Sequence, residues 1–357
     1  MTTDENIMRR CFQLARLGQG HVSPNPMVGC VVVAPNGTIV SEGYHQQCGC
    51  NHAERNALTA HGNEDKDFRG CTLYVNLEPC SHHGKTPPCA DLVVEKGIKK
   101  VVISTTDPNP LVAGNGIRKL QNTGIEVVTG VLETEGRFLN RRFFTFMEKK
   151  RPYVILKWAE TADGFMDIDR SYMPDGNYWI TNDILKTLSH KWRTVEDAIM
   201  VGTNTVANDN PQLTARLWPG RHPLRITIDR TGRLPQSSHI FDGSVPTVVF
   251  TENINLQSRE NLTFVNVDFQ NLLPSVLDFL YQKGVQSLIV EGGKRLIDSF
   301  LQQNLWDEAR QLQGIAIFGS GLPSPTITAN PDKTETFDDN TIKYYYNPCS
   351  RTHTEQS

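Results

Sequence analysis

Short apolar runs alternate with segments of helical periodicity along the whole chain, and this alternation limits the folds that the sequence can adopt. In the first 150 residues, five segments are typical of strands: 28–33, a short segment ending near Glu42, 71–77, 101–104 and 125–128. Helices are expected to begin at caps or turn residues: Asp4, Asn51, Pro87 and Gly116. This order of elements predicts a three-layer α/β sandwich.

The second half repeats the alternation but carries no sequence repeat of the first. Strands are expected near 153–158, 198–202, 224–229, 247–251, 286–291 and 309–318, with helices near 182–192, 273–283 and 294–303. A helical stretch over 133–150 runs into Arg151-Pro152 and a new strand. The boundary is therefore expected near residue 148, which divides the 357 residues into domains 1–148 and 149–357.

Charge and hydropathy restrict the partners that such a chain can have. Residues 1–150 carry 17 Lys and Arg against 15 Asp and Glu, and the remainder carries 19 against 24, so neither half has the basic excess of a nucleic-acid-binding domain. No apolar run approaches the roughly 18 residues of a membrane helix. The start, MTTDENIMRR, does not have the pattern of a secretory signal. We expect a cytoplasmic protein with a small-molecule substrate and without nucleic-acid or membrane partners.

Seven of the eight cysteines lie between Cys11 and Cys89, where they accompany a metal-binding pattern. His52-Ala53-Glu54, followed by Pro79-Cys80 and by Cys89, has the residue types of the zinc deaminase signature. One imidazole and two thiolates leave the fourth position of a tetrahedral zinc for water. Zinc lowers the pKa of that water, which makes hydroxide available as the nucleophile, and Glu54 would carry its proton to the leaving amine.

Alternatives to a deaminase centre exist for the same residues. Glu54 stands three residues after Asn51, where it would complete a capping box. Eight residues separate Cys80 from Cys89, although two are usual in the general pattern. Cys48 and Cys50 could also close a structural zinc site around His52.

The second half contains two glycine turns between an expected strand and a helix. They are Gly202-Thr203-Asn204-Thr205 and Glu291-Gly292-Gly293-Lys294. Their backbone N–H groups could bind phosphate, whereas such turns are also common without a ligand. The Gly-x-Gly-x-x-Gly fingerprint of a Rossmann dinucleotide site does not follow the first strand of this half.

Several blocks resemble the bifunctional deaminase/reductase family of riboflavin biosynthesis. They are Pro24 to Gly29, Gly43-Tyr44-His45, His52 to Ala57, Leu77 to Cys89 and Asp107-Pro108-Asn109-Pro110. The wide gap between Cys80 and Cys89 is similar to the family's own spacing. The resemblance implies a cytidine-deaminase-like fold with a pocket for a diaminopyrimidinone that bears a ribose phosphate. The implied pocket residues are Asn25, His45, Lys85, Asp107 and Asn109.

The second half resembles the reductase part of the same family, which has a dihydrofolate-reductase-like α/β fold and uses NADPH. The matching blocks are Lys157 to Ala159, Asp163-Gly164, Trp179 to Thr181, Asp209 to Thr214 and Glu291 to Gly293. The implied NADP contacts are Ala159, Trp179, Thr205, Asp209, Gly293, Lys294, Arg295, Leu296, Ile297, Asp298 and Ser299. The implied substrate contacts are Asn177, Arg193, Leu213, Arg216 and Glu291, of which the two arginines suit a phosphate.

Departures from the family pattern lie near this second site. Asn177 stands where the family commonly has serine, the segment 167–175 is longer than usual, and Arg230 replaces a small hydroxyl residue. We expect Arg230 to pair with the 2′-phosphate of NADP. Without the resemblance, Arg193 and Arg216 would each be interpreted as surface ion pairs, and Trp179 would fit a core residue and a wall of the cofactor site equally well.

The sequence therefore predicts an enzyme for two consecutive steps of riboflavin synthesis. The first domain would deaminate the 2,5-diamino-6-ribosylamino-pyrimidinone 5′-phosphate with zinc, and the second would deliver a hydride from NADPH to the ribosyl C1′, with Lys157 binding or protonating the opening sugar. The family commonly self-associates, so a homo-oligomer is expected. Alternatives are a nucleic-acid or nucleoside deaminase with an accessory binding domain, a zinc-stabilised scaffold, and an active deaminase with an inactive reductase half.

Overall fold

The chain divides into two compact units, Met1–Lys150 and Arg151–Ser357. The computed structural model describes residues 2–59, 62–63, 66–81, 87–109, 113–170 and 178–348. Within these residues, no helix is long and apolar enough to cross a bilayer. The division lies two residues after the boundary expected near residue 148.

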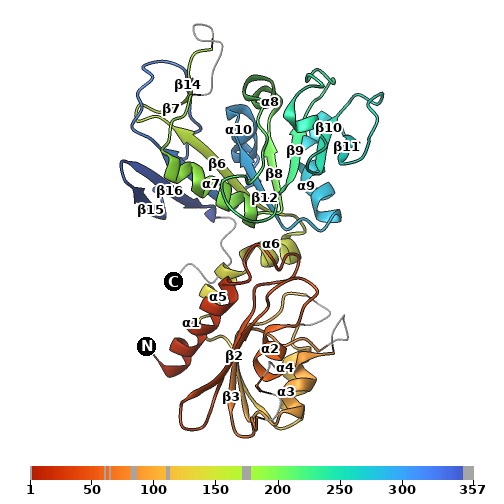
Figure 1. The fold of residues 1–357 in the computed structure, drawn as a ribbon, viewed down its shortest axis with the longest axis vertical. Helices are drawn as coiled ribbons and strands as arrows, with labels where there is room; N and C mark the ends of the chain where they lie inside the picture. Colours follow the sequence, from red (N-terminus) through yellow and green to blue (C-terminus); the bar gives the residue numbers. More distant parts are fainter. Residues whose placement is uncertain are drawn as a thin grey trace. The chain divides into compact units, whose positions relative to one another are not determined.

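The first unit is built on a five-stranded sheet with the order β2-β1-β3-β4-β5 (Figure 1). β1 is antiparallel to β2 and β3, whereas β3, β4 and β5 are parallel, so the carboxyl ends of β3 and β4 meet at one edge. The elements are α1 (Thr3–Arg16), β1 (Gly29–Val33), β2 (Ile39–Tyr44), α2 (Ala53–Thr59), β3 (Thr72–Leu77), α3 (Cys89–Glu95), β4 (Lys100–Thr105), α4 (Asn115–Asn122), β5 (Glu126–Val128), α5 (Glu133–Leu139) and α6 (Arg141–Lys149).

Helices cover both faces of this sheet. Figure 1 shows α1 and α5 on one side and α2, α3 and α4 on the other. Successive residues of β1 point to opposite faces: Val31 packs with Met8 of α1, and Val32 packs with Leu58 of α2. The three-layer sandwich predicted from the sequence is confirmed.

The second unit contains a nine-stranded sheet with the order β11-β10-β9-β8-β12-β6-β13-β16-β15. The strands from β11 to β13 are parallel, and β16 and β15 add an antiparallel edge. The elements are β6 (Tyr153–Glu160), β7 (Phe165–Asp167), α7 (Asp183–Val195), β8 (Ala198–Val201), α8 (Thr203–Asp209), β9 (Leu224–Ile228), β10 (Thr247–Thr251), β11 (Leu262–Asn266), α9 (Leu272–Gln282), β12 (Ser287–Glu291), α10 (Lys294–Gln302), β13 (Glu308–Gln313), β14 (Leu322–Pro323), β15 (Lys333–Phe337) and β16 (Asn340–Tyr346), with short 3₁₀ turns at His239–Phe241 and Phe269–Asn271.

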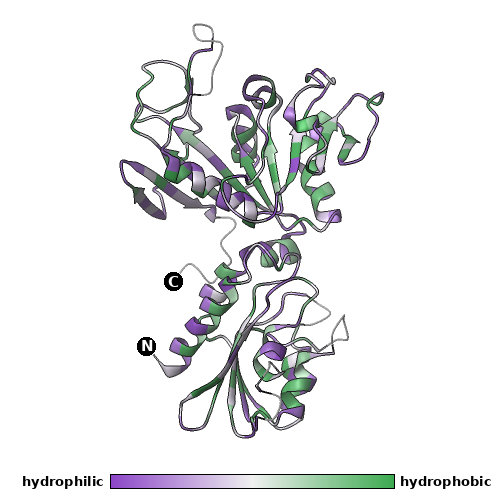
Figure 2. Cartoon of the chain, in the orientation of Figure 1, coloured by the Kyte–Doolittle hydropathy of each residue, from purple (hydrophilic) through white to green (hydrophobic). Residues whose placement is uncertain are grey.

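The central strands of this sheet are apolar on both faces because helices cover both (Figure 2). Val290 of β12 packs toward α9 and α10, and its neighbour Ile289 packs on the opposite face with Val206 of α8. The carboxyl ends of β6, β8 and β12 therefore lie at one edge of the sheet, where the loops to α8 and α10 begin.

Three boundaries differ from the sequence predictions. Thr2, and not Asp4, caps α1, because Thr2 and Glu5 form a reciprocal capping box while Asp4 accepts a hydrogen bond from the Tyr74 hydroxyl. The helical stretch over 133–150 is two helices that meet at Asn140. The strand expected over 309–318 ends at Gln313, and residues 315 and 317 are exposed isoleucines.

The strands β7, β11, β14, β15 and β16 were not predicted. β11 and β15 are the edge strands of the large sheet, and β16 lies next to β15. Their sequences are polar or alternating, as in KTETF and NTIKYYY, because these strands bury one face at most.

Candidate functional site

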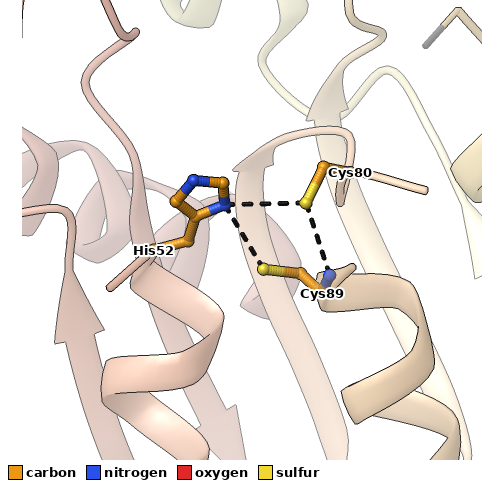
Figure 3. A group of neighbouring side chains, drawn as sticks. All are labelled: His52, Cys80 and Cys89. Atoms are coloured by element: carbon orange, nitrogen blue, oxygen red, sulfur yellow. Dashed lines mark hydrogen bonds between the residues drawn. The ribbon is translucent and has the colours of Figure 1, made fainter. Parts of the chain in front are cut away.

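The first site lies where α2 and α3 begin beside the end of β3 (Figure 3). His52 directly precedes α2, Cys80 lies three residues after β3, and Cys89 is the first residue of α3. His52 Nδ1 lies 3.6 Å from Cys80 Sγ and 3.5 Å from Cys89 Sγ. The backbone N–H of Cys89 also donates to Cys80 Sγ at 3.3 Å. Cys80 and Cys89 are therefore in direct contact, although eight residues separate them in the sequence.

This geometry fits a zinc ion. With zinc–sulfur and zinc–nitrogen bonds of ordinary length, tetrahedral ligands have nitrogen and sulfur about 3.6 Å apart, close to both separations here. The three ligand atoms all lie within 4.8 Å of one another. Among the residues that the structure describes, these three form the one group of His, Cys, Asp and Glu ligand atoms that could hold a metal ion. Cys48 and Cys50 are exposed and lie outside it.

The electrostatics favour a thiolate at Cys80. Hydrogen bonds from the Cys89 side chain and from His52 lower the pKa of Cys80, and the same contact with Cys80 raises the pKa of His52. Since the thiolate is the form that binds zinc, the site is prepared for the metal.

Glu54 lies in the first turn of α2 and is almost fully buried. Burial, followed by the negative charge of Cys80, raises the pKa of its carboxyl group to about 7. A carboxyl group with such a pKa is suited to accept and return a proton near neutral pH. The charge of Cys80 and a hydrogen bond with Cys89 both act on the ionisation of this carboxyl group, so Glu54 lies beside the metal group.

His45 connects the expected pocket residue Asn25 to the metal group. Its Nδ1 contacts the carbonyl oxygen of Asn51 at 2.9 Å, and its Nε2 contacts Asn25 Nδ2 at 3.0 Å. Donation from Nδ1–H and acceptance at Nε2 fit both contacts, and burial lowers the pKa of this imidazole. The ring packs edge-on against His52, with 5.4 Å between the centroids.

Two asparagines that the sequence did not single out hold the segment carrying Asn25. Asn140 exchanges two hydrogen bonds with the backbone of Met27, of 2.8 and 2.9 Å. The buried Asn76 donates to Met27 O and accepts from the N–H of Gly29. Asn140 lies at the junction of α5 and α6, within a charged helical stretch without any motif, so the sequence contained no signal of this role.

Two of the remaining expected pocket residues of this unit, Asp107 and Asn109, follow β4. Asp107 Oδ1 accepts a hydrogen bond from the N–H of Asn109 at 2.8 Å, which forms a local turn. The Asp107 N–H donates to the buried carboxylate of Glu78, another residue that sequence reasoning missed. Lys85 lies outside the described residues.

The second site centres on a buried charge cluster at the end of β12. Glu291 accepts two hydrogen bonds from the guanidinium of Arg193, of 2.7 and 3.0 Å, and its carboxylate lies 3.6 Å from Lys157 Nζ. Burial opposes ionisation of Glu291, but the charges of Arg193 and Lys157 hold its pKa at about 2. Burial lowers the pKa of Lys157. Arg193 is therefore part of a buried ion pair and not of a surface one.

Other expected substrate residues lie close to this cluster in the fold. Arg193 Nη1 donates to the carbonyl oxygen of Thr214. The preceding residue, Leu213, is buried and has a left-handed backbone conformation. Burial and the charges of Arg193 and Arg216 lower the pKa of His190 to about 4. His190 was not singled out in the sequence. Asn177 lies outside the described residues.

The two glycine turns expected to bind the cofactor contact each other. Gly293 N–H, at the start of α10, donates to Thr205 Oγ1 of α8 at 3.0 Å, and Gly292 has a φ of 70°. Asp209, at the end of α8, pairs with Arg170 at 2.9 Å, and burial raises its pKa. Trp179 is 61% exposed, which excludes a core role, and Lys186 lies over its ring.

The other expected cofactor contacts differ in their surroundings. Ala159 lies in β6 and is partly buried. Lys294 pairs with Asp298, and the Ser299 hydroxyl donates to the carbonyl oxygen of Arg295.

Two of the α10 residues, Leu296 and Ile297, direct their side chains into the hydrophobic core. Arg230 is exposed and pairs with Glu252 at 2.7 Å.

Two family models match the chain. The cytidine and deoxycytidylate deaminase zinc-binding region matches residues 1–105, and the RibD C-terminal domain matches residues 152–343. The riboflavin biosynthesis protein RibD of Aquifex aeolicus is 41% identical over 325 residues, 89% of each chain. That of Escherichia coli is 37% identical over 323 residues, covering 85% of this chain and 86% of the relative.

Two solved structures superimpose on almost the whole length of this chain. The deaminase/reductase of Thermotoga maritima superimposes with a TM-score of 0.85 at 39% identity, covering 97% of this chain and 99% of the other. Acinetobacter baumannii RibD gives 0.84 at 30% identity, covering 96% and 98%. The predicted fold class, a cytidine-deaminase-like sandwich followed by a dihydrofolate-reductase-like domain, is confirmed. The chain belongs to the RibD family of bifunctional, zinc- and NADPH-dependent deaminase/reductases of riboflavin biosynthesis.

Proposed function

We propose that residues 1–148 deaminate a diaminohydroxyphosphoribosylaminopyrimidine and that residues 149–357 reduce the resulting 5-amino-6-(5-phosphoribosylamino)uracil. These are the two activities in the name of the Thermotoga maritima relative. The observation that carries the proposal is the triad of His52, Cys80 and Cys89 with the buried Glu54 beside it.

In the deaminase unit, zinc would be held by this triad and supply a water of lowered pKa as the nucleophile. Glu54 takes up the proton released from that nucleophile and returns it to the departing amino group. One carbon–oxygen bond forms at the pyrimidine, and one carbon–nitrogen bond breaks as ammonia leaves. The pKa of about 7 of the Glu54 carboxyl group suits both proton transfers.

The pyrimidine and its ribose phosphate would contact Asn25, His45, Lys85, Asp107 and Asn109. His45 is neutral because its Nε2 accepts from the Asn25 amide nitrogen while its Nδ1 donates to the Asn51 carbonyl oxygen, so it orients the Asn25 amide without adding charge. The hydrogen bonds from Asn140 and Asn76 to the Met27 backbone support the same segment.

In the reductase unit, bound NADPH would supply the hydride for the ribosyl C1′. The bond from C1′ to the ring oxygen breaks, and that oxygen needs a proton to become the ribityl hydroxyl. We assign this proton to Lys157, whose lowered pKa makes its ammonium a better acid than an exposed lysine. Glu291 stays ionised and positions Lys157 and Arg193.

The substrate phosphate would bind at Arg193 and Arg216, and the substrate would also contact Asn177, Leu213 and Glu291. NADPH would contact Ala159, Trp179, Thr205 and Asp209 and the start of α10 from Gly293 to Ser299. Arg230 would bind the 2′-phosphate, which has to replace Glu252 as its partner. Arg230→Ala should then reduce the preference for NADPH over NADH, and an unchanged preference would contradict this role.

A coupled assay with the diaminopyrimidine substrate, with and without NADPH, tests the proposed function. Deaminated product is expected in both reactions, and a ribityl product only with NADPH. A chain that deaminates but never forms the ribityl product has an inactive reductase half. A chain that deaminates a tRNA or a free nucleoside and not this pyrimidine contradicts the proposal.

We also propose that the protein works in the cytoplasm as a homo-oligomer. The support is the resemblance to a family that commonly self-associates. Sedimentation velocity at several protein concentrations tests the assembly, and a single monomeric species would contradict it.

A further inference from the structure

We propose that Glu78 is a positioning residue of the deaminase site. It fixes the position of the proposed substrate loop, residues 107–109, relative to the proposed zinc ligand Cys80. This assignment rests on the proposed deaminase function. Glu78 stands directly after β3 and two residues before Cys80, and its side chain is 4% exposed.

Four backbone N–H groups converge on this carboxylate. One oxygen, Oε2, accepts from Asp107 at 3.3 Å and from Gly114 at 3.0 Å. The other oxygen, Oε1, accepts from Gly116 at 2.9 Å and from Ile117 at 3.3 Å. An ionised carboxylate has about four lone-pair sites and no proton, so it can satisfy all four donors together.

These four donors belong to the two ends of one connection. Asp107 follows β4, while Gly114, Gly116 and Ile117 form the start of α4. The positive end of the helix dipole adds to the attraction for a buried carboxylate. Glu78 therefore closes the connection between β4 and α4 onto the end of β3.

The packing around α4 leaves little freedom for this contact to shift. A Cβ atom on Gly116 would lie 2.1 Å from the carbonyl oxygen of Pro79 and 3.2 Å from Glu78 Oε1. Glu78 N–H also donates to Thr105 O at 2.9 Å, which fixes its backbone to β4.

The contacts form a continuous path between the two parts of the site. On one side, the chain continues from Glu78 through Pro79 to Cys80. On the other, Glu78 binds Asp107, and Asp107 Oδ1 binds the N–H of Asn109. Displacement of the Asp107 backbone would therefore move both proposed substrate contacts relative to the metal.

Glu78→Gln tests this role because it keeps the shape of the side chain and exchanges one acceptor oxygen for an NH₂ group. Two backbone N–H groups would then face a donor. The KM for the pyrimidine in deamination is expected to rise about tenfold or more. The zinc content should stay at one ion per chain, and reduction of 5-amino-6-(5-phosphoribosylamino)uracil should be unchanged.

Glu42→Gln is the matched control. It makes the same exchange in the same unit, where Glu42 forms a bidentate ion pair with Arg10, and it should leave the KM unchanged. If Glu78→Gln does not fold, Glu78→Asp, which keeps the charge but shortens the reach, should still raise the KM.

A lowered melting temperature with an unchanged KM, in whichever of the two variants folds, would overturn the assignment and leave Glu78 as a helix cap only. Loss of zinc would overturn it as well. If the wild type does not deaminate the pyrimidine, the proposed function fails and this assignment with it. If the wild type is active and the KM stays unchanged, only the role of Glu78 fails.

Discussion

Glu54 and Glu291 are both buried glutamates, but their pKa values are shifted in opposite directions because their neighbours differ. Glu54 lies beside thiols and has its pKa raised to about 7. Glu291 lies between the guanidinium of Arg193 and the ammonium of Lys157, which hold its pKa at about 2. Glu54 can therefore exchange a proton near neutral pH, whereas Glu291 keeps its charge and serves as a fixed anion.

Replacing Glu54 by Gln should remove the proposed proton carrier and leave the three proposed metal ligands in place. We expect the kcat of deamination to fall by about 10²–10⁴-fold. Zinc content, measured by elemental analysis, and the reductase rate should be close to those of the wild type. Glu42→Gln again provides the control. A Glu54→Gln enzyme that deaminates within tenfold of the wild-type rate would show that another group carries the proton.

His190 makes the stability of the second unit sensitive to acid. Its pKa is about 4 in the folded protein, since burial and the charges of Arg193 and Arg216 oppose protonation more than Glu291 favours it. The unfolded chain takes up this proton near pH 6.5. The free energy of unfolding of the second unit is therefore not reduced by His190 above about pH 6.5. It falls by roughly 1–3 kcal/mol in total as the pH drops from about 6.5 toward 4.

His190→Gln should flatten this pH dependence between pH 6.5 and 4, and exposed His239→Gln should not. Urea unfolding followed by tryptophan fluorescence measures the free energy of unfolding of the second unit selectively, because all five tryptophans lie after residue 150. If the free energy of unfolding of His190→Gln depended on pH as steeply as that of the wild type, the prediction would be wrong.

At the scale of the elements, the close approach of α2 to β2 places Glu54 and His52. Gly43 of β2 makes this approach possible. A Cβ atom there would lie 2.4 Å from the backbone nitrogen of Ala57 and 2.6 Å from the carbonyl oxygen of Ala53. Backbone atoms cannot move aside as flexible side chains do, so any larger residue must push the helix away from the sheet.

Gly43→Ala should lower the unfolding free energy of the first unit by roughly 2–3 kcal/mol and reduce deamination further than the lost stability explains. Calorimetry measures the effect, and the first unit is identified as the transition without a change in tryptophan fluorescence. Gly202→Ala, which has a φ of −76° and 3.8 Å of room, is the control. A Gly43→Ala variant within about 0.5 kcal/mol of the wild type would contradict the packing argument.

The elements that the sequence predicted are those with a strong local signal. β1, β3 and β4 are apolar runs buried on both faces, and α2 and α3 begin at the metal ligands. The antiparallel strand β16, which lies next to the edge strand β15, was missed because buried and partly buried residues largely alternate along it and three of its seven residues, Asn340, Thr341 and Lys343, are polar. The end of β13 was missed because the apolar residues after Gln313 continue the pattern although they face solvent.

At the scale of the whole molecule, each unit has its own core and its own polar site. The zinc ligands all belong to the first unit, and the cluster around Glu291 belongs to the second. The chemistry of the two sites is also separate, because one depends on a metal and the other on a hydride donor.

Removal of zinc by a chelator should therefore abolish deamination and leave the NADPH-dependent reduction of 5-amino-6-(5-phosphoribosylamino)uracil intact. Addition of zinc after removal of the chelator should restore deamination. Both rates are measured on the same sample, one by release of ammonia and the other by absorbance of NADPH. A parallel loss of the reductase rate would show that the second unit depends on the metal.

Contacts between residues distant in sequence were the part of the sites that the sequence could not predict. His52, Cys80 and Cys89 are an exception, because zinc deaminase chemistry requires particular residue types in a recognisable order although His52 lies 28 and 37 positions from the two cysteines. The pairing of Arg193 with Glu291 joins residues 98 positions apart, and neither side chain identifies its partner. The four N–H donors of Glu78 are backbone groups, which no residue type reveals.

Asn140 extends the working length of the deaminase part beyond the residues that carry its motifs. The deaminase zinc-binding region matches residues 1–105, whereas Asn140 binds the backbone of Met27 from the junction of α5 and α6. A first unit cut directly after β4 would lose both of these hydrogen bonds. A truncated deaminase therefore has to keep the chain as far as α6 to hold the segment that carries Asn25.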